Sequence, residues 1–67
     1  MSQGDQGRML AAERRQHIME MLGNRSSVLI ADICRECGVS AVTARADLDF
    51  LEGEGRLKRT HGGAVPV

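Results

Sequence analysis

Residues 39–65, VSAVTARADLDFLEGEGRLKRTHGGAV, predict a polar-faced helix, a glycine stop and a short basic hairpin in unbroken succession. With successive residues 100° apart, Ala44, Leu48 and Leu51 fall on one apolar stripe of a helix over about residues 41–54. The opposite face of this helix is left for a partner. This order of elements indicates a DNA recognition helix followed by a wing.

Glycine and basic residues define the hairpin. Two glycines weaken the last turn of the helix, and Arg56–Thr60 then resembles a short strand. Gly62-Gly63 is a turn signal before Ala64, so we expect a hairpin with His61 near its tip.

A further helix and a short extended piece are expected near the amino terminus. Helix formers predominate over 9–22, where Ile18, Met21 and Leu22 share one stripe, and Gly23-Asn24 is expected to close this helix. Ser26–Leu29 is expected to be extended, as a strand added beside the hairpin.

A second helix is predicted at about Ala31–Cys37, with one apolar face made by Ile30, Ile33, Cys34 and Cys37. The turn after it is short: Gly38 can be left-handed, Val39 can fill the core and Ser40 can cap the next helix. Two helices joined by so tight a turn cross steeply. The sequence therefore predicts a mainly α fold, a three-helix winged helix-turn-helix with a short β-hairpin wing.

The size and composition exclude several functions. A chain of 67 residues buries only about 60% of its unfolded surface, which argues against a large catalytic cleft. It has one Phe and no Trp or Tyr, so it lacks an aromatic platform for single-stranded bases. The sequence shows no catalytic triad, acid–base pair or phosphate loop, so nothing in it indicates an enzyme. We expect residues 1–8 to be a flexible arm and 9–66 to be the domain, with Pro66-Val67 as a cut end.

The formal charge is zero, from nine Lys plus Arg and nine Asp plus Glu. This balance argues against a nucleic-acid partner and keeps a winged-helix protein-interaction module open as an alternative. The distribution favours DNA, because a cationic hairpin follows an acidic helix end. The sequence contains neither a membrane span nor a secretory signal, so we interpret the protein as cytoplasmic.

The residues predicted to contact DNA come from the third helix and the wing. Arg45 can grip guanine O6 and N7 or a phosphate, or else pair with Asp49 as a solvated residue. Thr43 can contact DNA or bond to the backbone near the helix cap. Ser40 is interpreted first as the helix cap and second as a phosphate contact. The predicted set is Ser40, Ala41, Val42, Thr43, Arg45, Ala46, Asp49, Arg56, Lys58, Arg59, His61, Gly62 and Gly63.

Some members of this set have a second interpretation. Val42 and Ala46 suit close approach to base edges, or are plain surface. Asp49 can accept from cytosine N4 or tune specificity by repulsion, whereas Asp47 is interpreted as structural, anchoring an amide or an arginine. Arg59 can face inward, and the paired glycines of the wing are explained equally by the turn.

Cys34-Arg35-Glu36-Cys37 suggests zinc or redox chemistry, but structural zinc takes four ligands and only His17 and His61 remain as further good donors. Both cysteines fall on the apolar face of the second helix, which favours buried, reduced thiols. We therefore expect no metal and no organic cofactor, with a metal or redox switch as the weakest alternative.

Three separated motifs resemble the amino-terminal winged-helix domain of DeoR-type bacterial regulators. They are Arg14, Ile18 and Leu22 at four-residue spacing, then Ser40-Ala41-Val42-Thr43-Ala44-Arg45-Ala46-Asp47-Leu48, and last His61-Gly62-Gly63-Ala64. The chain departs from the family at Ala46, where the family has a second basic residue, and at Leu29, where the family has a polar helix cap. We expect the second helix to be frayed at its start or capped by Ser27.

The resemblance implies a regulator that binds double-stranded operator DNA, usually as a repressor of sugar or related catabolic genes. It also implies a larger carboxy-terminal domain, absent from this sequence, that binds a phosphorylated sugar and forms the homo-oligomer. Within the family motif, Arg14 becomes a further candidate for a phosphate contact.

Overall fold

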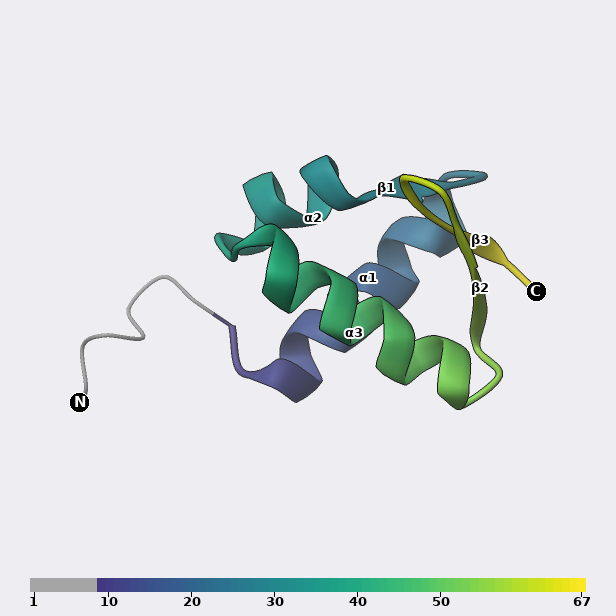
Figure 1. Ribbon diagram of the computed structural model, residues 1–67, viewed down its shortest axis with the longest axis horizontal. Helices are drawn as coiled ribbons and strands as arrows, with labels where there is room; N and C mark the ends of the chain where they lie inside the picture. The colour runs from purple at the N-terminus through teal and green to yellow at the C-terminus, as the bar shows by residue number, and fades with distance from the viewer. Residues whose placement is uncertain (1–8) are drawn as a thin grey trace.

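The computed structural model describes residues 9–67, which form three helices and a three-stranded sheet (Figure 1). In chain order the elements are α1 (Ala11–Asn24), β1 (Val28–Leu29), α2 (Ile30–Cys37), α3 (Ala41–Gly53), β2 (Leu57–Thr60) and β3 (Gly63–Pro66). The predicted mainly α fold with a hairpin wing is confirmed. The expected flexible arm, residues 1–8, lies outside the described residues.

One apolar core lies between the helices and the sheet. Helix α3 crosses the middle of the molecule, with α1 behind it, α2 beside its amino-terminal half and the hairpin beside its carboxy-terminal half (Figure 1). The apolar stripes predicted for α1 and α3 are buried, whereas the predicted face of α2 is buried at Ile33 and Cys37 and partly buried at Ile30 and Cys34. The core consists of Ile18, Met21, Leu22, Val28, Ile33, Cys37, Ala44, Leu48, Leu51, Leu57 and Ala64.

The ends of α2 and α3 follow from the local sequence. Gly38 closes α2 in the left-handed conformation with φ 69°, and the Ser40 hydroxyl caps α3 by accepting the Thr43 N–H at 3.3 Å. At the other end of α3, Gly55 has φ 76°, while its N–H donates to the Glu52 carbonyl and the Arg56 N–H to the Leu51 carbonyl. These two bonds form a Schellman motif, so the predicted glycine stop is confirmed.

The predicted bounds of α1 were wrong at both ends. The helix begins at Ala11, where the Glu13 carboxylate accepts the Leu10 N–H at 3.0 Å. It then continues through Gly23-Asn24, because neither residue is left-handed and the chain becomes extended only at Arg25, with φ −134°. Glycine permits a helix to end but does not oblige it to.

The sheet has the order β1-β3-β2, and both pairs of strands are antiparallel. The predicted strand beside the hairpin is confirmed, since Val28 pairs with Ala64 and Leu29 with Gly63. The Ile30 N–H, the first of α2, donates to the Gly62 carbonyl at 2.9 Å. The Gly62 carbonyl of the hairpin turn thus satisfies the first N–H of α2, and Ser27 does not cap this helix.

Gly63 belongs to β3 and not to the turn, which consists of His61 and Gly62. A Cβ atom on Gly63 would lie 1.8 Å from the Val28 carbonyl oxygen, whereas one on Gly62 would meet nothing within 4 Å. Only glycine therefore allows β1 to approach β3 at this position. No helix within residues 9–67 is long and apolar enough to cross a bilayer.

We expect Gly63→Ala to lower the free energy of unfolding by about 2 kcal/mol or more, because the new methyl group forces β1 away from β3. Gly62→Ala is the matched control and should change stability by less than about 0.5 kcal/mol. Urea unfolding monitored by circular dichroism measures both. Equal stability of the two variants would contradict the close approach at Gly63.

Candidate nucleic-acid interface

The outward face of α3 carries small side chains and one unpaired cation. Val42 is 74% exposed, and Arg45, Ala46 and Asp49 are exposed with it on the same side of the helix. Arg45 forms no ion pair with any other residue in the described part of the chain. The alternative in which it pairs with Asp49 is not formed, because that carboxylate is bound by Arg59.

The first turn of α3 shows the capping role expected of its polar residues. The Ser40 hydroxyl accepts the Thr43 N–H and donates to Thr43 Oγ1 at 3.4 Å. Ser40 is exposed, while Ala41 and Thr43 are half-buried. Both hydroxyls therefore have a structural function in the first turn of α3.

A buried carboxylate joins α3 to α1. Asp47 is only 1% exposed and accepts hydrogen bonds from Arg14, through Nε and Nη2, and from Arg15, whose Nε lies 3.0 Å from Oδ1. The hydrogen bond to Asp47 raises the pKa of Arg14, so its guanidinium stays charged. The structural interpretation of Asp47 is confirmed. Arg14, a candidate for phosphate contact, is instead committed to this carboxylate and is largely buried.

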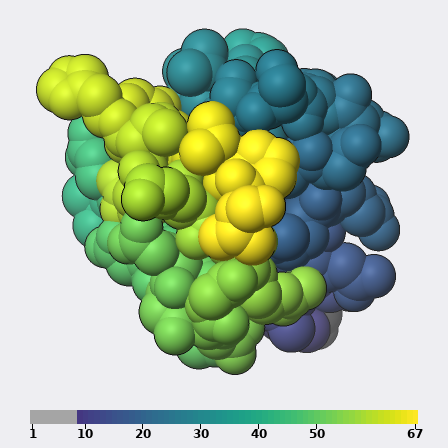
Figure 2. Space-filling model, turned by 90° about the vertical axis from the view of Figure 1, so that its right-hand side faces the viewer, coloured from purple at the N-terminus to yellow at the C-terminus, as the bar shows by residue number. Residues whose placement is uncertain are grey.

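Alternate residues of β2 face in opposite directions. Leu57 is buried, whereas Lys58 and Thr60 are exposed, as is His61 in the turn. In Figure 2 the green atoms of α3 and the yellow-green atoms of the hairpin lie together on the left, and the blue atoms of α1 lie on the right. Lys58 is thus exposed on β2, and its ammonium is free of ion pairs with residues 9–67.

Arg59 faces α3. Its guanidinium pairs with Asp49, its backbone N–H donates to Glu52 Oε2 at 2.8 Å, and its Nε is buried without a hydrogen-bond partner among the described residues. Two of the predicted contacts, Arg59 and Asp49, are therefore bound to each other.

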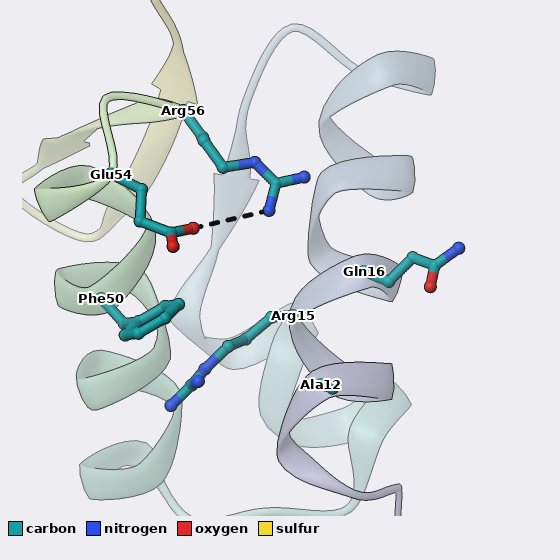
Figure 3. A pocket seen from close by; sticks show the side chains of 6 residues that line it. All are labelled: Ala12, Arg15, Gln16, Phe50, Glu54 and Arg56. Atoms are coloured by element: carbon teal, nitrogen blue, oxygen red, sulfur yellow. Dashed lines mark ion pairs between the residues drawn. The ribbon is translucent and has the colours of Figure 1, made fainter.

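Arg56 lies apart from the other predicted contacts. It lines a cavity of about 460 Å³ between α1 and the carboxy-terminal half of α3, together with Ala12, Arg15, Gln16, Phe50 and Glu54 (Figure 3). Its Nη1 lies 3.6 Å from Glu54 Oε1, and the Arg15 guanidinium stacks over the half-exposed Phe50 ring, 3.9 Å from its centre. Gly63, also among the residues predicted to contact DNA, is buried against β1.

The two cysteines are free thiols, with Cys37 buried and Cys34 half-buried. Burial raises the pKa of the Cys37 thiol, which keeps it protonated and unreactive at neutral pH. Within residues 9–67 no three His, Cys, Asp or Glu side chains are grouped to hold a metal ion.

The sequence pattern did not single out Arg15, whose part in holding α3 is seen in the structure. The signal was present in Asp47, which precedes Leu48 on the buried side of the helix. A carboxylate in that position requires cationic partners, and Arg14 and Arg15 on α1 supply them.

The geometry of a capped helix with an outward cation, followed by a hairpin packed beside it, agrees with the family comparison. Residues 14–67 match the model of the DeoR-like helix-turn-helix domain. The chain belongs to this DeoR-like family. Members of the family are DNA-binding transcriptional regulators and not enzymes, so this DeoR-like domain binds DNA.

Several curated relatives are similar over most of this DeoR-like domain. The uncharacterized regulator YulB of Bacillus subtilis is 44% identical over 88% of the chain, which spans 23% of that protein. A putative galactitol utilization operon repressor of Escherichia coli is 39% identical over 88% of the chain, and the match covers 53% of that repressor. The lactose phosphotransferase system repressor of Lactococcus lactis is 47% identical over 76% of the chain, and the match covers 20% of that protein. No solved structure gives a significant match.

We expect Asp47→Asn to lower the free energy of unfolding by about 3 kcal/mol, because it leaves two partly buried guanidinium groups without their carboxylate. Glu54→Gln removes one charge from an exposed pair and should change stability by less than about 0.5 kcal/mol. Urea unfolding of both variants measures the difference. A cost for Asp47→Asn as small as that of the control would show that α1 and α3 do not depend on this carboxylate.

Proposed function

We propose that α3 enters the major groove of operator DNA and that the exposed side of the hairpin contacts the adjacent backbone or minor groove. The observation that carries this proposal is the Arg45 guanidinium, which has no ion pair within residues 9–67 and lies on a helix face whose neighbours, Val42 and Ala46, are small enough for close approach to bases. Lys58 and His61 are exposed on the hairpin that follows α3. We expect Arg56, Arg59 and Gly63 to contribute indirectly or not at all.

For the whole protein we propose a cytoplasmic repressor of genes for sugar catabolism. The names of the galactitol and lactose repressors support this pathway class. We further propose that a phosphorylated sugar is the effector and that homo-oligomerisation pairs two such domains on two half-sites. A single domain with few phosphate contacts should bind nonspecific DNA weakly, with a Kd of ~10⁻⁴–10⁻⁶ M.

Arg45→Ala should weaken binding to the preferred duplex by ~1–3 kcal/mol and leave the fold intact, because it removes a bidentate guanine or phosphate contact. Fluorescence anisotropy at matched salt measures the loss, on a duplex first selected from a random pool. Arg25→Ala is the matched control, since Arg25 lies outside α3 and the hairpin and pairs with Glu36. Equal affinity of the Arg45 variant and wild type would remove Arg45 from the interface.

Lys58→Ala should weaken binding to all sequences and reduce the slope of log affinity against log salt by about 0.9, because one phosphate contact is lost. Arg56→Ala changes the same charge beside the cavity and should leave the slope unchanged. If the two variants behaved alike, the side assigned to the interface would be incorrect.

If no duplex perturbed the amide shifts of Thr43, Arg45 or Lys58, a protein-interaction module would become the better hypothesis.

A further inference from the structure

The ion pair between α3 and the hairpin has an unusual distribution of exposure. Asp49 is 66% exposed, whereas Arg59 is only 22% exposed, and the pair joins Asp49 Oδ1 to Arg59 Nη1. An ionised carboxylate has two oxygens and about four acceptor positions. The pair uses one oxygen and leaves the other accessible on the outward face of α3.

Arg59 is held in place by α3 at two points. Its side chain reaches Asp49, and its backbone N–H donates to Glu52 Oε2 at 2.8 Å. Because its Nε is also buried, the guanidinium cannot turn toward a phosphate without breaking the ion pair with Asp49. These contacts suit a residue that orients another side chain better than one that grips DNA.

Asp49 and Arg45 offer opposite hydrogen-bonding groups on the same face. They are four residues apart, which separates them by about 6 Å along the helix axis. Successive base pairs are about 3.4 Å apart, so the two side chains face base pairs one or two steps from each other. Arg45 only donates and Asp49 only accepts, and no ion pair links them.

We propose that Arg59 is a positioning residue that holds the Asp49 carboxylate on the reading face of α3, where it accepts a hydrogen bond from cytosine N4. The inference rests on the proposed entry of α3 into the major groove. Cytosine presents an amino donor there, and a carboxylate is its natural acceptor. Pairing with Arg59 cancels the charge that phosphates would otherwise repel, and it fixes the orientation of the accepting oxygen.

Selection of duplexes from a random pool at low salt, followed by sequencing, tests this assignment. Wild type should enrich cytosine one or two base pairs from the guanine whose preference depends on Arg45. Asp49→Ala should reduce that cytosine preference about 5- to 100-fold and retain the guanine preference. Asp49→Asn should shift the preferred base toward adenine, whose N6 and N7 an amide contacts together.

Arg59 is tested by the same readout. Arg59→Ala should broaden the choice of base at the Asp49 position only, and Arg59→Lys should restore it in part because the charge is kept. Glu54→Gln, an exposed acid outside the face, is the control and should leave every position unchanged. Urea midpoints identify any variant that has lost the fold, and the Asp49 variants decide the assignment if Arg59→Ala has done so.

Four results would overturn the inference. Unchanged base preference in Asp49→Ala would remove Asp49 as a reader, and higher affinity for all sequences alike would show that it acts only by repulsion. A uniform loss of affinity in Arg59→Ala, with a salt slope flatter by about 0.9, would make Arg59 a phosphate contact. If wild type enriched no sequence, the proposed function would fail as well, whereas a response to Arg45→Ala alone would leave it standing.

Discussion

The Asp47 carboxylate, buried between α1 and α3, is the interaction on which the position of the reading helix depends. Two arginines of α1 bind it, so the orientation of α3 is set by directional hydrogen bonds as well as by apolar packing. The rest of the core consists of apolar side chains, whose contacts are not directional. A buried ion pair is directional, and it resists movement of the helices because a charge that loses its partner is left in a poorly solvated site.

Local sequence signals predicted most of the architecture because each had a local physical cause. Gly38 and Gly55 take left-handed conformations, Ser40 caps α3, and the stripe of Ala44, Leu48 and Leu51 is buried. The errors concerned contacts between distant segments. Whether Gly23 ends a helix, and which group caps α2, depends on where the chain and the hairpin turn lie in space, which a local pattern does not contain.

The same distinction applies to the candidate site. The period of a helix identified Val42, Arg45 and Ala46 as outward, and the structure agrees. The period of a strand likewise allowed Arg59 to face inward, but its partner Asp49 lies on another element and could not be named. Counting the basic residues in a stretch of sequence therefore overestimates how many cations on the surface are free of ion pairs. Here only Lys58 among the three basic residues of the hairpin region lacks an ion pair within residues 9–67.

The hydrogen bond from the Ile30 N–H to the Gly62 carbonyl joins the hairpin turn to the first residue of α2. Together with the packing of Gly63 against β1, it ties the wing to the helix-turn-helix at two points. A hinged wing would adjust itself to whatever groove width it meets, whereas a wing tied in this way has less freedom to do so. We expect the duplex to make the adjustment, so that the ease with which an operator bends and narrows contributes to its selection at base pairs that no side chain touches.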